Sequence, residues 1–400
     1  MSVNIKIPKL NSVKFLLLFS IFVSFTFEII VGQSSLNIIL KGIKYIFMLI
    51  PILLSLLEIL LNRKRKYMFK SELNIGLVMV IVLLILSLYY SVKEAMFSLE
   101  SIIELVQMFF PFIISFLLIN FISEDDIILF MKYALVITII GYIIYEFKSG
   151  VNLFSIKNYL KISLINSYSP FENDSFAEIA SALSAFFIYY RKKLPGFCFF
   201  SIILNFLIFK RVLLLMTILL FIITLFDQEN KSVPTYALII DNIIWIGIIF
   251  ITFKIYKDYT YRYDHFRDVL ANFTVTRIYR FWYVIERHFK SYGLGSTSVY
   301  LIKQNISYVG VNFEMDFIRI MFELGPIAII TMVYSYLKIA KSNLYSIILI
   351  NFCFLNLLMA NGILNYWGYS IRFIVILLIL KKNKLIENNR KVKFVLKENF

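Results

Sequence analysis

The feature that most constrains this chain is a series of long apolar runs with few charged residues inside them. The runs are about 15 to 25 residues long, which is enough for a helix to cross a hydrocarbon core about 30 Å thick. They show no alternation of polar and apolar residues, so a transmembrane β-barrel is not expected. Because backbone groups in lipid must be satisfied within one segment, each run is predicted to be a helix. The sequence therefore predicts an all-α polytopic integral membrane protein.

The apolar runs indicate about twelve transmembrane helices within a single transmembrane domain that covers residues 1–400. The alternative is that 195–210 and 212–226 form one broken segment, which would leave about eleven. The first run follows Lys6, Lys9 and Lys14 without a small-residue cleavage site, so it is predicted to be a span and not a removed signal peptide. The runs lie near 13–31, 36–61, 73–91, 101–122, 127–147, 176–190, 195–210, 212–226, 236–255, 314–337, 343–361 and 366–380.

Basic residues in the short connectors predict the orientation of the chain in a cell membrane, because cytoplasmic loops carry an excess of Lys and Arg. This rule places both termini inside and two longer loops, 148–175 and 256–313, outside. The basic tail 381–400 is then cytoplasmic, and we expect it to lie along the anionic inner leaflet. The connectors that fix this orientation are 63–66, 191–193, Lys338 with Lys341, and 381–384.

The formal net charge of +16 follows from these connectors, so a nucleic-acid partner is not expected. Cys198 and Cys353 both fall inside apolar runs, which is typical of small buried side chains and not of a disulfide or a metal pair. His265 and His288 lack further ligands at the spacing of a zinc site. No metal and no cofactor are therefore expected.

An amphipathic helix is predicted near 276–290, within the second external loop. At about 100° per residue its basic side chains share one face and its large apolar side chains share the other. Such a helix lies in the membrane interface. Because guanidinium groups bind phosphate oxygens in pairs, the basic face indicates either a lipid-linked pyrophosphate or an anchor on anionic phospholipid. Gly293-Leu-Gly295 is expected to end this helix. The basic face carries Arg277, Arg280, Arg287 and Lys290, and the apolar face Ile278, Phe281, Trp282, Ile285 and Phe289.

Two further groups of charged residues lie at or inside apolar runs, where charge is costly and usually faces a cavity or a partner. Lys210 and Arg211 interrupt the stretch between 195 and 226 at the external face. Either their side chains extend from a helix end to the membrane interface, or they form a second cationic surface, called a cationic wall here, that binds an anionic headgroup. The other group begins the run 314–337. There Arg319 and Glu323 are spaced as an intrahelical pair, and Asp316, with Glu314, is a candidate general base near the external mouth.

In this order the motifs resemble those of the Wzy-type polysaccharide polymerases, members of the O-antigen polymerase and ligase superfamily. The resemblance rests on an Asn/Asp-rich loop before a span (Asn173-Asp174), Lys210-Arg211, Thr276 to Trp282, Gly293-Leu-Gly295 and Glu323-Leu-Gly325. As sequence it is confined to about 170–177, 207–216 and 274–327.

The resemblance implies a GT-C-like bundle and a metal-independent, inverting glycosyltransferase. Such an enzyme would act at the external face of a bacterial inner membrane on oligosaccharides linked to undecaprenyl pyrophosphate. It would make O-antigen, capsular or exopolysaccharide chains. Its expected protein partners are a flippase and a chain-length regulator. Arg211 and Arg277 match the family's arginines, with Arg280 a competitor in the same helix. The ligase branch of the family expects a histidine near Asp316 and this chain has none, which favours a polymerase.

Two other functions remain open from the sequence. An O-antigen-type ligase would share the architecture but depend on a histidine. A flippase or another transporter of lipid-linked oligosaccharides is the alternative from a different class. Transporters often contain paired halves with broken helices, and no such internal repeat is recognisable in this sequence.

Overall fold

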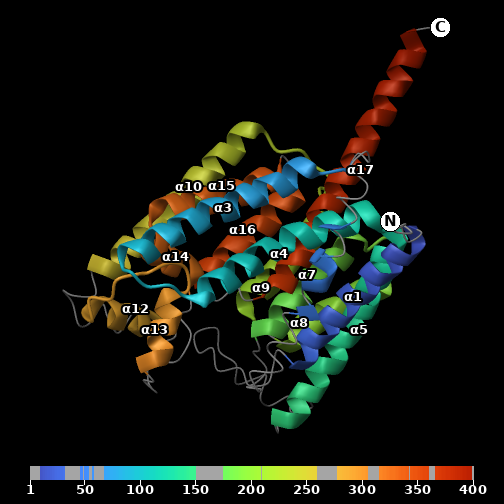
Figure 1. The fold of residues 1–400 in the computed structure, drawn as a ribbon. Coiled ribbons are helices and arrows are strands. Elements are labelled where there is room, and N and C mark those ends of the chain that lie inside the picture. Colours follow the sequence, from blue (N-terminus) through green and yellow to red (C-terminus); the bar gives the residue numbers. More distant parts are fainter. Residues whose placement is uncertain are drawn as a thin grey trace, which may run out of the picture. The chain divides into compact units, whose positions relative to one another are not determined.

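The computed structural model describes residues 10–31, 46–47, 49–53, 56–57, 67–149, 174–208, 210–258, 277–304, 315–341, 343–359 and 365–398 (Figure 1). The chain divides into two compact units. Unit 1 comprises residues 1–70, 113–217 and 370–378, and unit 2 comprises 71–112, 218–369 and 379–400. The boundary therefore falls within α4 (Leu99–Phe121), α9 (Arg211–Leu225) and α17 (Tyr366–Glu398) and after the first residue of α3 (Lys70–Lys93), and the apolar runs alone do not indicate it.

The described residues are almost entirely helical, which confirms the predicted all-α class for this part of the chain. The only β pairing within the described ranges is an isolated bridge between Ser232 and Asn343. The helices are α1 Leu10–Val31, α3 Lys70–Lys93, α4 Leu99–Phe121, α5 Glu124–Ser149, α7 Asp174–Tyr189, α8 Pro195–Ile208, α9 Arg211–Leu225, α10 Thr235–Asp258, α12 Arg277–Glu286, α13 Ser296–Gln304, α14 Asp316–Leu324, α15 Pro326–Ala340, α16 Leu344–Met359 and α17 Tyr366–Glu398.

Four stretches in the described part of the chain are long and apolar enough to cross a membrane: Lys70–Lys93, Leu99–Phe121, Glu124–Ile144 and Thr235–Asp258. In Lys70–Lys93 and Thr235–Asp258 most side chains of the apolar window are not buried inside the protein. Large apolar side chains exposed in this way are costly in water and favourable in lipid. The helices therefore indicate a membrane-associated protein.

In unit 1, α5 packs against α1, α7 and α8, and α7 packs closely on α8. A small polar network lies between these helices: Asn205 on α8 donates to the hydroxyl oxygens of Ser184 on α7 and Thr217 on α9, at 2.8 and 3.0 Å. The Ser184 hydroxyl in turn donates to the Ser201 carbonyl at 2.8 Å. Hydrogen bonds of this kind fix the register of apolar helices that would otherwise slide past one another.

In unit 2, α10 packs on α14 and α15, and α16 packs on the same two helices. The short helices α12 and α13 join this group through α10 and α14. The apolar face of α12 is buried in a cluster that includes Ile278, Phe281, Trp282 and Val284. This face, which the sequence assigned to lipid or to the helix bundle, therefore packs on protein.

Two apolar runs gain detail from the structure. The run predicted at 314–337 is two helices, because α14 ends at Leu324 and Pro326 begins α15. Gly325 between them has φ +80°, a conformation that glycine adopts at little cost. The ambiguous stretch 195–226 is also two helices, α8 and α9. At the other end of the chain, α17 continues as one helix through most of the range expected for the tail.

The end of α3 provides a test of the backbone geometry. Met96 N–H donates to the Ser91 carbonyl and Ala95 N–H to the Val92 carbonyl, at 3.0 and 3.2 Å, which is the Schellman pattern. Ala95 has φ +51° and is exposed. Because a left-handed conformation costs an L-residue roughly 1–2 kcal/mol, Ala95→Gly should raise the free energy of unfolding by about 1 kcal/mol. Thermal unfolding of the purified protein in detergent measures this change. Ala134→Gly, inside α5, should lower stability instead.

Candidate functional site

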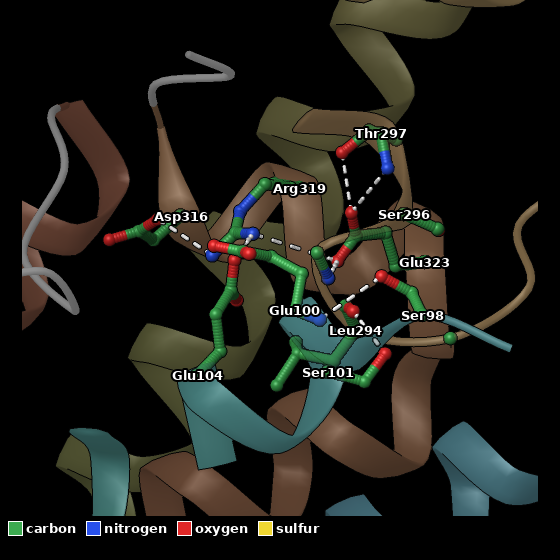
Figure 2. Close-up of polar contacts among 12 residues, drawn as sticks. Ser98, Glu100, Ser101, Glu104, Leu294, Ser296, Thr297, Asp316, Arg319 and Glu323 are labelled. Atoms are coloured by element: carbon green, nitrogen blue, oxygen red, sulfur yellow. Dashed lines mark hydrogen bonds and ion pairs between the residues drawn. The ribbon is translucent and has the colours of Figure 1, made fainter. Parts of the chain in front are cut away.

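A buried group of four charged residues lies between α4 and α14 in unit 2 and is called the Arg319 cluster here. Arg319 Nη1 contacts Glu104 Oε1 at 2.6 Å, and Nη2 contacts Asp316 Oδ1 at 3.2 Å. Glu323 Oε2 lies 3.9 Å from Nη1. Figure 2 shows the guanidinium group surrounded by the three carboxyl groups. None of the four side chains is more than 4% exposed, so the cluster is closed to bulk solvent.

Three carboxyl groups share one guanidinium in the Arg319 cluster. A buried carboxylate is stable only when it is paired and hydrogen-bonded. Arg319 supplies that pairing with both terminal nitrogens, and its contact with Glu104 joins residues 215 positions apart in the chain. The cluster therefore holds α4 against α14. Met315, immediately before α14, is buried and has φ +67°.

Glu323 connects the cluster to the segment 292–297, which is called the glycine loop here. Its Oε2 accepts the Gly295 N–H at 2.8 Å, and its Oε1 accepts the Thr297 N–H at 3.0 Å. The Thr297 hydroxyl also donates to Oε1 (Figure 2). These three hydrogen bonds fix the carboxyl group of Glu323 against the backbone of the loop. Glu323 is thus part of the structure of the loop and is not directed to solvent.

Serine side chains from α3 and α4 complete the glycine loop. Ser91 donates to the Tyr292 carbonyl at 2.7 Å and Ser101 to the Leu294 carbonyl at 2.6 Å, while Ser87 accepts the Leu294 N–H at 2.8 Å. Burial raises the pKa of the Tyr292 phenol above its usual value, and the Glu323 carboxylate raises it further, so this phenol keeps its proton at neutral pH. Five backbone polar groups of the loop therefore pair with a side chain from α3, α4 or α14.

Both glycines of the loop have backbone angles that favour glycine. Gly293 has φ +124° and Gly295 has φ +75°. A Cβ atom at Gly295 would lie 2.9 Å from Glu104 Oε1, and one at Gly293 would lie 3.2 Å from the Ser87 carbonyl oxygen. Gly293-Leu-Gly295 therefore allows close contact between the loop and α3 and α4. The sequence analysis expected this motif to end the amphipathic helix, but α12 ends earlier, at Glu286.

His288 closes the helix instead. α12 ends at Glu286, and the Phe289 N–H and His288 N–H donate to the carbonyls of Val284 and Ile285, at 3.1 and 2.9 Å. His288 has φ +50°, the position where a Schellman motif usually has glycine. The glycine loop begins only after this motif. One of the chain's two histidines is thus explained by the geometry of a helix end.

The arginines of α12 differ in their surroundings. Arg277 is the first residue of the helix, and its Nη1 donates to the Met359 carbonyl at the end of α16 at 3.0 Å. Arg277 and Arg280 are half-buried. Arg287, beyond the end of the helix, is exposed, and its guanidinium lies 5.6 Å from the centre of the Tyr283 ring. The guanidinium of Arg277 is thus held by a hydrogen bond to the end of another helix.

The two expected bases have different outcomes. Asp316 is 1% exposed and pairs with Arg319, so it belongs to the Arg319 cluster. Glu314 lies outside the described residues. The expected pair of Arg319 and Glu323 is present at 3.9 Å, but the closer partner of Arg319 is Glu104.

Lys210 and Arg211 lie in unit 1. Arg211 is the first residue of α9 and is half-buried. Lys210 is 8% exposed, and its Nζ lies 3.5 Å from Glu178 Oε1 on α7. The other oxygen of Glu178 contacts Arg372 Nη2 on α17 at 2.7 Å. A second buried ionic group therefore forms where the sequence analysis placed a cationic wall.

Three residues of these groups were not identified from the sequence: Glu104, Glu178 and Arg372. Each is a charged residue inside an apolar run, and such residues usually mark functional or paired positions in membrane helices. That signal was present for all three. Their partners were not predictable, because every pairing joins distant parts of the chain.

Comparison of this chain with models of known protein families, with curated proteins and with solved structures finds no match.

Proposed function

We propose that this protein polymerises oligosaccharide repeat units linked to undecaprenyl pyrophosphate into long polysaccharide chains at the external face of a bacterial inner membrane. In this reaction an acceptor sugar hydroxyl attacks the anomeric carbon of the growing chain, and undecaprenyl pyrophosphate leaves. The donor is already activated, so the reaction requires no nucleotide. About twelve membrane helices with both termini inside would place the two longer loops on the side where the reaction occurs.

One observation supports this proposal above the others. Three of the motifs behind the family resemblance, Arg277 with its helix, Gly293-Leu-Gly295 and Glu323-Leu-Gly325, belong to one assembly in unit 2. α12 packs on α13, α13 packs on α14, and Glu323 of α14 binds the backbone of the glycine loop directly. Short motifs that are far apart in a chain arise often by chance, but chance matches have no reason to build one local structure.

The arginines of α12 have the role of stabilising the departing pyrophosphate. Negative charge develops on that group in the transition state, and fixed cationic donors stabilise it because they do not need to reorganise. Arg277 suits this role because its hydrogen bond to the Met359 carbonyl fixes its planar guanidinium group in place. Arg280 and Arg287 extend the cationic face, and Lys210 and Arg211 are the corresponding cations of unit 1.

The general base is assigned to the start of α14. Asp316 accepts a hydrogen bond from Arg319 at 3.2 Å, which fixes the orientation of its carboxyl group. Glu314, two residues earlier, is the other candidate. The partners of the enzyme in this proposal are the lipid-linked substrate, membrane lipids, a flippase that supplies the substrate and a regulator of chain length.

Replacing Arg277 tests the proposal. Arg277→Ala should lower the polymerisation rate by roughly 10²–10³-fold, because one donor to the developing charge is lost. Purified protein in proteoliposomes, supplied with a lipid-linked repeat unit, gives the rate from the distribution of product lengths on a gel. Lys303→Ala is the matched control, since Lys303 is an exposed cation on α13 of the same unit, and it should polymerise normally.

The same variants separate the alternative functions. In cells, a polymerase defect leaves single repeat units at the outer surface. If Arg277→Ala instead traps single units on the cytoplasmic side, the protein is a flippase. If it leaves chain length unchanged but prevents transfer of finished chains to a final acceptor, the protein is a ligase. Normal chain length and normal transfer in Arg277→Ala would contradict the proposed role of this arginine.

A further inference from the structure

The accessible side of α12 carries a row of three side chains, Tyr279, Tyr283 and Arg287, which is called the tyrosine stripe here. The three residues are four positions apart, so on a helix they lie within about 80° of one another. Tyr279 and Arg287 are exposed, and Tyr283 is half-buried. The helical pattern continues to the end of the stripe, because the Arg287 N–H donates to the Tyr283 carbonyl at 3.2 Å.

The opposite side of α12 is covered by protein. It is buried in a cluster with side chains of α10, α13 and α14, and α12 lies beside α13 (Figure 1). A helix that anchors a protein in the membrane interface keeps its apolar side in lipid. The structure therefore does not favour a membrane anchor as the role of the accessible side. The buried residues of α12 are Ile278, Phe281, Trp282 and Val284.

Contacts with aromatic rings hold the tyrosine stripe in place. Arg287 Cζ lies 5.6 Å from the centre of the Tyr283 ring, and the ring centres of Tyr283 and Tyr300 on α13 lie 6.5 Å apart. Tyr279 has an edge contact with Trp282, with ring centres 5.3 Å apart. Within the described part of the chain the Arg287 guanidinium has no hydrogen bond and no ion pair. Its N–H donors are thus oriented by the Tyr283 ring and accessible to a ligand.

The chemistry of the tyrosine stripe suits a sugar ring. The face of an aromatic ring carries partial negative charge, so it attracts the C–H groups on one face of a pyranose. Phenol and guanidinium groups beside such a ring can donate hydrogen bonds to the sugar hydroxyl groups. A phosphate group would use the cation, but it has no C–H face with which to contact an exposed ring. The combination of Tyr279 with Arg287 therefore favours a carbohydrate.

We propose that the tyrosine stripe is a carbohydrate subsite, in which Tyr279 stacks on a pyranose ring of the lipid-linked repeat unit while Tyr283 and Arg287 donate hydrogen bonds to its hydroxyl groups. This inference rests on the proposed function for the identity of the ligand. Arg280 follows Tyr279 directly on α12, so a sugar on the stripe lies beside a diphosphate on the basic face. Arg277 then serves the departing pyrophosphate, and Arg287 serves the sugar.

Two probes separate the sugar from the diphosphate: inorganic pyrophosphate, and the repeat-unit oligosaccharide that mild acid releases from the lipid-linked substrate. Calorimetry measures their binding to the full-length protein in nanodiscs of zwitterionic lipid. Tyr279→Ala should weaken binding of the oligosaccharide roughly tenfold, the effect of one lost stacking contact, and leave binding of pyrophosphate unchanged. Arg277→Ala should show the reverse pattern. If Tyr279→Ala weakens binding of both probes equally, its role is structural and the subsite is wrong.

Further variants show which part of each side chain binds the sugar. Tyr279→Phe keeps the ring and should retain most of the oligosaccharide binding, whereas Tyr279→Leu is apolar without a ring and should lose as much as Tyr279→Ala. Equal binding by the Phe and Leu variants overturns the stacking role. Arg287→Gln should weaken binding of the oligosaccharide roughly tenfold, through loss of its charged donor. Tyr236→Ala is the matched control, since Tyr236 is an exposed tyrosine on α10 of the same unit, and it should bind both probes normally.

The polymerisation assay separates this inference from the proposed function. Tyr279→Ala should raise KM and leave kcat nearly unchanged, because the lost contact is shared by the bound substrate and the transition state. If the native protein polymerises and Tyr279→Ala changes neither KM nor oligosaccharide binding, the subsite is wrong and the proposed function stands. Tyr279 would then be an interfacial tyrosine of the kind that borders a membrane. If the native protein does not polymerise but binds the oligosaccharide through Tyr279, the subsite stands and the protein has another activity on sugars.

Discussion

Arg319→Met is expected to lower the free energy of unfolding by about 3–5 kcal/mol, the usual cost of removing one partner from a buried ion pair. Glu104, Asp316 and Glu323 would then be three carboxyl groups without their shared cation, all of them buried. Methionine preserves most of the volume of the side chain, so the loss would arise from charge and not from a cavity. Thermal unfolding in detergent, together with the yield of monodisperse protein, measures the effect.

Lys338→Met is the matched control for this prediction. Lys338 is an exposed cation on the neighbouring helix α15, and its amine contacts only Tyr334 in the described structure. Its replacement should change stability little, because exposed cations contribute little. Adding Glu104→Gln to Arg319→Met should recover part of the loss by removing one of the stranded charges. Equal stability of Arg319→Met and Lys338→Met would show that the Arg319 cluster does not hold unit 2 together.

Gly295→Ala is the second prediction with a large effect. Its φ of +75° costs an L-residue roughly 1–2 kcal/mol. The added methyl group would lie 2.9 Å from Glu104 Oε1, which forces a shift in a packed core at a further cost of roughly 1–3 kcal/mol. Stability should therefore fall by roughly 2–5 kcal/mol. Because Glu104 must move, the Arg319 cluster should be disturbed as well, and polymerisation should fall with it.

Gly247→Ala provides the comparison for Gly295→Ala. Gly247 lies in the middle of α10, and a Cβ atom there would meet nothing within 4 Å. Alanine should stabilise this helix by up to about 1 kcal/mol. Both variants make the same replacement of glycine by alanine. Their thermal unfolding therefore compares the backbone angle and the free space at the two positions. If both substitutions shift stability in the same direction, the glycine loop is not as closely packed as the structure has it.

The helices were largely predictable from the sequence, for a clear physical reason. Long apolar runs have to form hydrogen bonds within themselves, so their length and position determine the helices closely. The break within 314–337 could also have been predicted, because Gly325-Pro326 is a strong helix-breaking pair. The division into two units could not, since it passes through the interior of α4, α9 and α17, where the sequence stays apolar.

The candidate site was predictable only in part. The basic face of α12 was visible because amphipathic spacing is a local pattern. The role of Glu104 was not predictable, because its partner Arg319 lies 215 residues away and the chain contains many other basic residues. The glycine motif was assigned to the end of a helix because glycine is common there, whereas a histidine has that position. Whether Arg211 and Arg277 share one anion site stays a prediction, since they belong to different units.

The break between α14 and α15 has a consequence for hydration. α14 has 9 residues and is therefore about 14 Å long, about half the thickness of a bilayer core. The Met321 carbonyl accepts the Gly325 N–H at 3.1 Å, but Pro326 has no N–H to offer the carbonyl that follows. Carbonyls of this kind are tolerated in a membrane only beside protein or water. If α14 and α15 form one interrupted span, a thin region of water or polar protein has to extend partway into the bilayer beside the break.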